Sequence, residues 1–170
     1  PARVLAFGAW LKNTACLLDG DTVHWSPLHG DLGTPTACLA LADSVEQLVH
    51  CAHGRIDAVA HDLHPDFEST RLALDWAERL GVPALPVQHH HAHVGVVLAE
   101  QGLIAPAIGL ALDGVGLGSD GDAWGGELLW VEGAQWRRTD HLAPLALHAG
   151  DTAAREPWRM AAAELHARGR

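Results

Sequence analysis

Residues 107–131 read AIGLALDGVGLGSDGDAWGGELLWV. An apolar run over 107–112 is followed by a glycine-rich turn, and a second apolar run covers 126–131. Short apolar runs bounded by turn residues are typical of buried β-strands. The stretch decides the fold because the chain opens in the same way: runs at 3–7, 14–18 and 22–26 surround a turn signal at Asp19-Gly20 and predict a first meander.

The residues between the two meanders alternate between strand and helix patterns. Such alternation is typical of α/β folds with parallel strands, here in mixed sheets because each meander is antiparallel. The spacing of apolar residues predicts a helix over 38–52 ended by Gly54, a strand over 56–60, a helix over 67–80 ended by Gly81, a strand over 84–87 and a helix over 89–101 ended by Gly102.

The second meander continues with a strand over 136–141, and a last helix is predicted from Asp151 or Thr152 to the end. We therefore expect two lobes of similar plan, 1–105 and 106–170, of which the second is incomplete. An open sheet edge is costly to leave unpaired. We expect further chain or a second copy, as in a homodimer, to cover it.

Composition excludes several classes of function. The chain has 48% apolar residues and a formal charge of −10 with only 11 lysines and arginines, which argues against binding to nucleic acids or anionic membranes. Three cysteines without CxxC spacing favour a reducing compartment. With no signal peptide and no apolar run of membrane-spanning length, we expect a cytoplasmic protein.

Four histidines crowd the stretch 87–101, VQHHHAHVGVVLAEQ. In a helix, His89 and His93 share one face and can hold a metal ion, whereas His90 and His91 are turned away. A third ligand, such as a carboxylate, is needed for Fe²⁺ or Zn²⁺. The alternative is a helix start capped by histidines, or a polar surface.

Six glycines lie in the segment 113–127. Glycines let backbone N–H groups approach a phosphate, and Asp113 or Asp120 can hold a cation or a hydroxyl. The segment has no P-loop lysine and is followed by a strand, which excludes the P-loop and the dinucleotide fingerprint. The alternative is a plain glycine-rich hairpin. The predicted phosphate-binding residues here are Asp113, Gly114, Gly116, Gly118, Asp120, Gly125 and Gly126.

A matching turn in the first meander, GAWLKNT at 8–14, offers Lys12, Asn13 and Thr14 as phosphate donors. Two such turns facing one cleft would form a phosphate clamp, as in the actin, Hsp70 and sugar-kinase architecture. The group HDLHPD at 61–66 follows a predicted parallel strand, where ligands bind in such sheets. It makes His61, Asp62 and His64 candidate substrate-site residues, unless the loop is only held by local hydrogen bonds.

Taken together, these motifs resemble the carbamoyltransferase domain of the HypF family, which matures [NiFe]-hydrogenases. GAWLKNT, the GDL of 30–32, AHDLHPDFEST, VQHHHAHV, LALDGVGLGSDGDAWGGE and REPWRMA occur in that family's order and spacing. The resemblance implies a two-lobed, actin-like (ASKHA, RNase H-like) fold. It also implies a transferase that uses ATP and carbamoyl phosphate through carbamoyl-adenylate and passes the carbamoyl group to the C-terminal cysteine of HypE for cyanide ligands.

By the same resemblance, His89 and His93 bind Fe²⁺ or Zn²⁺, and His90, His61, Asp62 and His64 act at the substrate. Lys12, Asn13 and Thr14 with the 113–126 loop bind the adenylate phosphate. The family's third metal ligand is an aspartate late in the second lobe, and its YrdC-like domain makes the adenylate. We therefore expect this chain alone to bind metal weakly and to use preformed adenylate at best.

Two other functions stay open. The first is a noncatalytic scaffold that docks HypE or self-associates. The second is a sugar-kinase-like phosphotransferase, for which the sequence offers no evident catalytic base.

Overall fold

The computed structural model describes residues 2–146 and 150–169. They form two compact units that divide between His89 and His90. The lobe boundary predicted after residue 105 stays a prediction. The helix that begins at His89 packs on the sheet of the second unit through Val94. Among the described residues no helix is both long and apolar enough to span a membrane.

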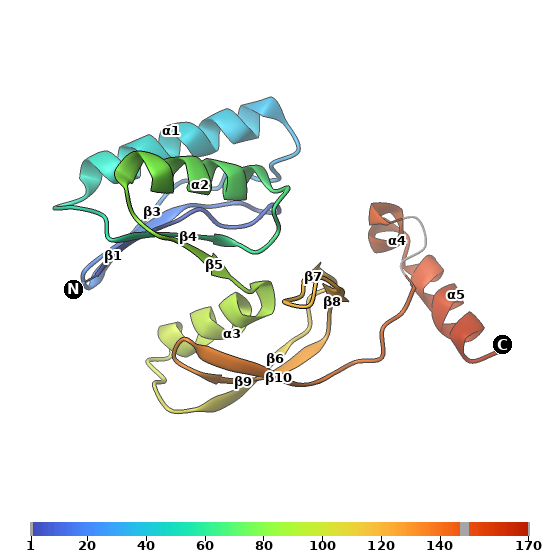
Figure 1. The fold of residues 1–170 in the computed structure, drawn as a ribbon. Coiled ribbons are helices and arrows are strands. Elements are labelled where there is room, and N and C mark those ends of the chain that lie inside the picture. The colour runs from blue at the N-terminus through green and yellow to red at the C-terminus, as the bar shows by residue number, and fades with distance from the viewer. Residues whose placement is uncertain (1, 147–149, 170) are drawn as a thin grey trace. The chain divides into compact units, whose positions relative to one another are not determined.

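The first unit is a mixed five-stranded sheet with two helices. The strands are ordered β3-β2-β1-β4-β5, antiparallel on the β3 side of β1 and parallel on the other side. Helices α1 and α2 both cover one face of the sheet (Figure 1). The elements are β1 (Arg3–Ala6), β2 (Cys16–Asp19), β3 (Thr22–Trp25), α1 (Pro35–Cys51), β4 (Ala58–Asp62), α2 (Glu68–Leu80) and β5 (Ala84–Val87).

The ends of α1 and α2 show which residues cap or terminate these helices. Thr34 caps α1 by accepting a hydrogen bond from the Ala37 N–H. Gly54 does not end α1, contrary to the prediction, because the chain already turns to extended geometry at Ala52. Gly81 does end α2, in the left-handed conformation that favours glycine.

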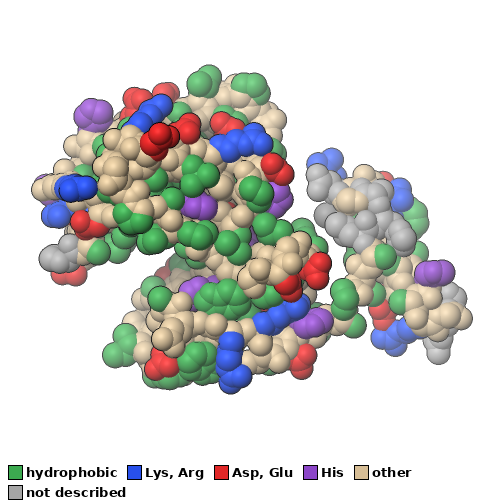
Figure 2. Space-filling model, viewed as in Figure 1, with side chains coloured by type: hydrophobic (Ala, Val, Ile, Leu, Met, Phe, Trp, Pro, Cys, Tyr) green, Lys and Arg blue, Asp and Glu red, His purple; other side chains and the backbone are tan. Residues whose placement is uncertain are grey.

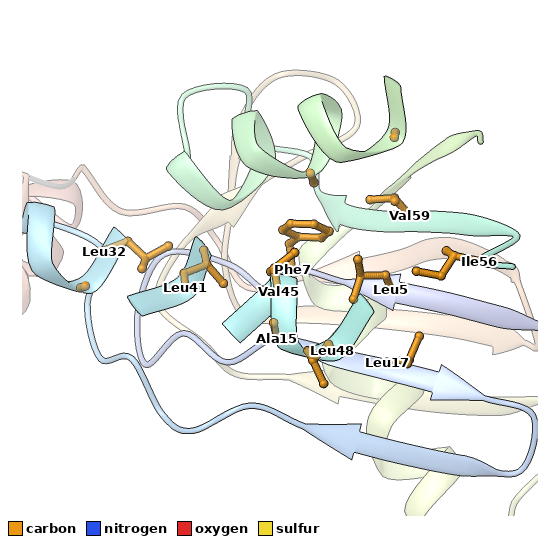
Figure 3. Close-up of a cluster of buried hydrophobic side chains, with 13 residues drawn as sticks. Leu5, Phe7, Ala15, Leu17, Leu32, Leu41, Val45, Leu48, Ile56 and Val59 are labelled. Atoms are coloured by element: carbon orange, nitrogen blue, oxygen red, sulfur yellow. The ribbon is translucent and has the colours of Figure 1, made fainter. Parts of the chain in front are cut away.

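The core of this unit lies between the sheet and the two helices. Leu5, Leu17 and Val59 from the sheet meet Leu41 and Val45 of α1, and all five side chains have no exposed surface (Figure 3). Apolar burial of this kind is the main stabilising contribution to folding. It holds the carboxyl end of β4, where the HDLHPD loop begins, in a fixed position.

The second unit consists of a helix on a small antiparallel sheet, a short hairpin and two C-terminal helices. The sheet order is β10-β9-β6. The glycine-rich segment forms the short hairpin β7–β8, which the sequence offered as an alternative. The expected single last helix is interrupted at Glu156, before Pro157. The elements are α3 (His89–Glu100), β6 (Ala107–Ala111), β7 (Gly116–Leu117), β8 (Ala123–Trp124), β9 (Glu127–Glu132), β10 (Gln135–His141), α4 (Asp151–Arg155) and α5 (Pro157–Ala167).

Helix α3 lies close against this sheet. Val94 packs on Leu129 and Val131. A Cβ atom at Gly109 of β6 would come within 2.3 Å of a Val94 methyl group, so only glycine permits this approach. The close contact fixes the histidine-rich start of α3 relative to the end of β6.

The GAWLKNT turn is held from inside by a buried polar network. The Asn13 side chain is 1% exposed, and its Nδ2 donates to the carbonyls of Phe7 (2.9 Å) and Ala9 (2.7 Å). Its Oδ1 must then accept from His29 Nδ1 at 2.8 Å, which leaves His29 Nε2 to accept from the Ser44 hydroxyl at 2.9 Å. A neutral His29 therefore satisfies both neighbours.

Acidification should weaken this network. Burial lowers the pKa of His29 below its ordinary 6.5, so between these two values the unfolded chain binds more protons than the folded one. The free energy of unfolding should therefore fall as the pH drops below about 6.5. Urea unfolding at about pH 7.5 and about pH 5.5 measures the decrease, which should be smaller in His29→Ala. An equal decrease in both proteins would contradict this account.

Candidate metal and phosphate site

Three potential metal ligands meet at the start of α3. His89 and His93 lie one turn apart on this helix, as their spacing predicted. Together with Asp113 they offer one ligand atom each, and these atoms all lie within 4.8 Å of one another. The sequence had placed Asp113 in the glycine segment with a possible cation role; the structure brings its carboxylate close to the two histidines.

Asp113 follows directly on β6 and faces α3. Its Oδ2 lies 3.9 Å from His93 Nε2 and 3.1 Å from His90 Nε2. The His90 side chain is fully buried, so it positions Asp113 from the protein interior and does not face a substrate. His91 is also turned away, as expected, and stacks on Trp136 with ring centroids 5.9 Å apart.

His89 is oriented by the HDLHPD loop. Asp62, at the end of β4, places Oδ2 2.7 Å from His89 Nδ1 and accepts the His64 N–H through Oδ1 at 2.8 Å. The side chain of Asp62 is nearly buried, at 6% exposure. A carboxylate that accepts from one ring nitrogen of a histidine leaves the other nitrogen free of its proton and ready to bind a metal.

The charge of Asp62 is maintained despite its burial. Burial raises the pKa of this carboxyl, but the hydrogen bond from His89 and the backbone hydrogen bond from His64 lower the pKa below its ordinary value. Asp62 is therefore an ionised acceptor at neutral pH.

The two histidines of HDLHPD are engaged locally. His61 Nδ1 lies 2.7 Å from the Asp62 carbonyl, and the His64 ring stacks on Phe67 with centroids 4.2 Å apart. Both side chains are partly exposed. Their predicted role at the substrate stays a prediction, whereas the structure gives Asp62 a definite part in holding His89.

The donor set suits the metals that the sequence suggested. Two imidazoles and one carboxylate are typical of catalytic Zn²⁺ sites and of non-haem Fe²⁺ sites, which keep a position open for substrate. The Asp62 carboxylate, which accepts a hydrogen bond from His89, adds to this fit. His89, His93 and Asp113 are the residues that would hold such an ion.

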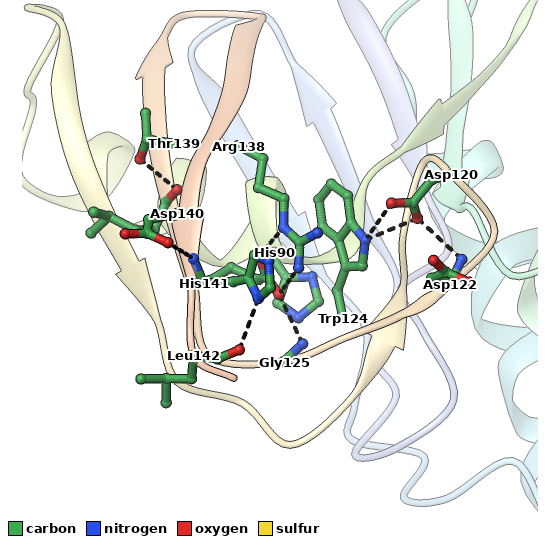
Figure 4. A network of polar contacts seen from close by, with 12 residues as sticks. His90, Asp120, Asp122, Trp124, Gly125, Arg138, Thr139, Asp140, His141 and Leu142 are labelled. Atoms are coloured by element: carbon green, nitrogen blue, oxygen red, sulfur yellow. Dashed lines mark hydrogen bonds and ion pairs between the residues drawn. The ribbon is translucent and has the colours of Figure 1, made fainter. Parts of the chain in front are cut away.

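The glycine-rich segment forms the hairpin β7–β8 (Figure 4). Asp120 accepts from the Trp124 indole N–H at 2.9 Å and from the Asp122 N–H at 3.1 Å. These bonds lower the pKa of Asp120, the backbone bond from Asp122 most of all. The Asp120 carboxylate is thus used inside the hairpin, and its predicted contact with nucleotide or cation stays a prediction.

Several of the glycines serve close packing within the hairpin. A Cβ atom at Gly118 would lie 2.2 Å from the Trp124 indole nitrogen, and one at Gly125 would lie 2.5 Å from the Gly114 carbonyl oxygen. Gly126 has a φ of +70°. By contrast, a Cβ atom at Gly114 would meet no atom within 4 Å, so its backbone is open to a ligand.

A buried ion pair that the sequence did not reveal supports the hairpin. Glu127 has no exposed surface and accepts from Arg138 Nε (2.6 Å), Arg138 Nη2 (2.9 Å) and the Gly125 N–H (3.0 Å) (Figure 4). The hydrogen bonds from Arg138 to Glu127 raise the pKa of Arg138. The guanidinium also lies 4.2 Å from the centroid of the Trp124 ring. The sequence signal for this ion pair is one acidic residue, Glu127, at the start of an apolar strand.

In the first unit, the GAWLKNT residues differ in exposure. Lys12 is exposed, with a φ of 47°, and its N–H donates to Asp31 of the GDL motif at 3.1 Å. Thr14 is partly exposed. The Asn13 side chain braces the turn through its hydrogen bonds. The phosphate contacts predicted for Lys12 and Thr14 stay predictions.

Removing the buried acid should loosen the hairpin. Glu127→Ala leaves Arg138 and the Gly125 N–H without their acceptor, and the free energy of unfolding should fall by about 2–4 kcal/mol. Urea unfolding followed by circular dichroism measures the loss. Glu132→Ala, an exposed acid on the same strand, should change it little. Equal stability of the two variants would show that the pair is not structural.

Comparison with known proteins matches two successive parts of the chain. Residues 1–100 match the HypF Kae1-like domain, and residues 109–169 match the second subdomain of the carbamoyltransferase Kae1-like domain. A carbamoyltransferase HypF homolog of Cupriavidus necator is 66% identical over 97% of this chain and 42% of its own length. Carbamoyltransferase HypF2 of the same organism is 59% identical over 98% of this chain and 21% of its own length.

A solved structure agrees with these matches. Full-length HypF in its phosphate- and nucleotide-bound form superposes with a TM-score of 0.85 at 34% identity, covering 96% of this chain and 21% of that one. The α/β fold with mixed sheets is thus the Kae1-like fold that the resemblance implied, and the chain spans less than half the length of these relatives. The chain belongs to the HypF carbamoyltransferase family.

Proposed function

We propose that this chain forms the metal-binding and phosphate-binding part of a carbamoyltransferase in [NiFe]-hydrogenase maturation. Its substrate would be carbamoyl-adenylate, made from ATP and carbamoyl phosphate, and its acceptor the C-terminal cysteine of HypE. The relatives named above are carbamoyltransferases several times longer or more than twice as long, so the complete reaction belongs to a longer protein that contains these residues.

One observation carries the proposal: His89, His93 and Asp113 converge within 4.8 Å. Each of two ligands also has a positioning partner, since Asp62 holds His89 and His90 holds Asp113. When bound there, Fe²⁺ or Zn²⁺ supplies a Lewis acid for the carbamoyl group or its phosphate. Such doubly supported ligands are expected of a reaction centre, because they fix the direction of the ligand atoms.

The remaining residues would bind and orient the substrate. Under this proposal the backbone N–H of Gly114, in the second unit, would donate to the adenylate phosphate. Lys12, in the first unit, would supply a positive charge for it. His61 and His64 lie on the loop whose Asp62 contacts His89, and they would contact the substrate. Asp62 itself accepts the hydrogen bond from His89 Nδ1.

Two of the chain's three thiols have properties that suit an external acceptor. Burial raises the pKa of Cys16, and burial together with the charge of Glu68 raises the pKa of Cys38. Both thiols therefore stay protonated at neutral pH and are poor nucleophiles. This supports a transfer in which the attacking cysteine comes from HypE.

The test uses the complete HypF protein that contains this chain, supplied with ATP, carbamoyl phosphate and HypE. His93→Ala should lose most of the bound metal, measured by plasma emission, and should abolish the mass shift of the HypE tail. Asp62→Asn keeps all three ligands but should weaken metal binding by about 10- to 100-fold. His50→Ala, an exposed histidine on α1, is the matched control and should behave as the wild type.

Carbamoylation of HypE at the wild-type rate by a metal-free His93→Ala variant would overturn the proposal. Loss of metal without loss of transfer in Asp62→Asn would separate the binding role of the site from a catalytic one.

A second candidate function, self-association, is favoured by one surface. β6 lies at the edge of the described sheet, and its side chains Ile108 and Leu110 are 59% and 60% exposed on the face away from α3. Figure 2 shows hydrophobic side chains along the lower margin of this unit, where the sheet lies. An open apolar edge of this kind can pair with a second copy.

Light scattering after size exclusion tests this candidate. The wild-type chain should elute as a dimer, and Ile108→Lys/Leu110→Lys as a monomer, because charges on an edge oppose pairing. A wild-type chain that stays monomeric at every concentration tested would exclude it.

A further inference from the structure

A second group of metal-binding side chains lies in the first unit, on the β2–β3 hairpin. Asp19 ends β2 and His24 belongs to β3. In the strand register Asp19 pairs with Thr22 and Leu17 pairs with His24, so Asp19 and His24 occupy diagonal positions on one face of the sheet. This is the face that α1 covers, because Leu17 on it belongs to the core.

The third member, His53, reaches the same place from the helix. α1 ends at Cys51, Ala52 is extended, and the chain then brings His53 to Asp19. The three residues offer one ligand atom each, and all these atoms lie within 4.8 Å of one another. Two imidazoles and a carboxylate from three separate segments therefore converge on one point.

Asp19 is held in position on both of its oxygens. Oδ2 accepts from the His53 N–H at 2.9 Å and lies 2.8 Å from His53 Nδ1, and Oδ1 accepts from Arg3 Nε at 2.6 Å. The side chain is 5% exposed. Hydrogen bonds from the backbone and side chain of His53, with that of Arg3, lower the pKa of Asp19 to about 2 in spite of burial. A carboxylate is thus present at neutral pH.

Hydrogen bonds within the cluster do not account for the burial of the His24 ring nitrogen. Its Nε2 atom is buried and has no hydrogen-bond partner among residues 2–146 and 150–169. Its ring lies beside that of His53, with centroids 6.4 Å apart at an angle of 44°. A buried ring nitrogen normally has a partner, so this atom indicates a ligand that the protein residues do not supply.

We propose that Asp19, His24 and His53 bind a divalent transition-metal ion of the Zn²⁺ type, which ties the β2–β3 hairpin to the end of α1. Imidazole and carboxylate ligands favour Zn²⁺ over Mg²⁺ or Ca²⁺, which take oxygen ligands. Three protein ligands leave a fourth position for water. This site shares no residue with His89, His93 and Asp113.

The approach of a metal needs only a small adjustment. Tetrahedral Zn²⁺ ligands at about 2.0–2.1 Å from the ion lie about 3.3 Å apart. His53 Nδ1 and Asp19 Oδ2 are 2.8 Å apart, and the His53 side chain is 78% exposed, so it can swing outward. Arg3 is the cation that faces the cluster, and it is bonded to Oδ1. An ion would therefore share Oδ2 with the backbone N–H of His53.

The test is calorimetric titration of the whole, untagged, chelator-treated chain with Zn²⁺. In a His93→Ala background, which removes the other site, one Zn²⁺ should bind. Adding His24→Ala or His53→Ala should weaken this binding by about tenfold or more. His50→Ala, on α1 outside the cluster, should leave it unchanged. His53 is exposed, so His53→Ala should fold even if His24→Ala does not.

The titration tests the two proposed metal sites independently of each other. If His93→Ala does not alter the stoichiometry of the wild-type chain while His53→Ala reduces it, the second site stands and the first does not. Zn²⁺ affinity that is the same in His53→Ala and in the His93→Ala background protein, or that His50→Ala reduces equally, would overturn the second site. A rise in melting temperature with Zn²⁺ that disappears in His53→Ala would support it further, because a ligand stabilises the state to which it binds.

Discussion

The hydrogen bond between Asp62 and His89 is the interaction on which the candidate site depends. It joins the end of a buried parallel strand to the first residue of α3 at 2.7 Å. β4 is rigid because its neighbours on both sides are paired and its side chains are buried in the core. The end of the strand therefore sets the orientation of the His89 ring through one carboxylate.

Much of the fold could be predicted because it depends on local patterns. The strands and helices up to Glu100 fall where apolar periodicity and turn residues place them, and Gly81 ends its helix as predicted. The helix ends that were predicted wrongly also have local causes. The chain becomes extended at Ala52, before Gly54, and the last helix is interrupted between Glu156 and Pro157. The β7–β8 hairpin consists of two-residue strands, which are too short to leave a periodic signal.

The site was less predictable, because its contacts join distant residues. Helical spacing alone pairs His89 with His93. The support of His89 by Asp62 requires knowledge that β4 ends beside the start of α3, and the link from Glu127 to Arg138 requires the register of β9 and β10. Asn13 illustrates the opposite error: its residue type suggested a phosphate donor, but it is 1% exposed and braces the turn. Residue type predicted which groups can bind a ligand. Burial determines whether such a side chain faces a ligand or the protein interior.

Charge limits how the glycine-rich hairpin can meet a phosphate. Its side chains include the carboxylates of Asp113, Asp120 and Asp122, and the nearby guanidinium of Arg138 is already paired with Glu127. Backbone N–H groups at open positions such as Gly114 can donate to a phosphate, but they do not offset this negative charge. A phosphate bound at the hairpin would therefore require a cation, which a metal ion held by Asp113 would supply. Under the proposed function, metal binding and phosphate binding in this unit would meet the same electrostatic requirement.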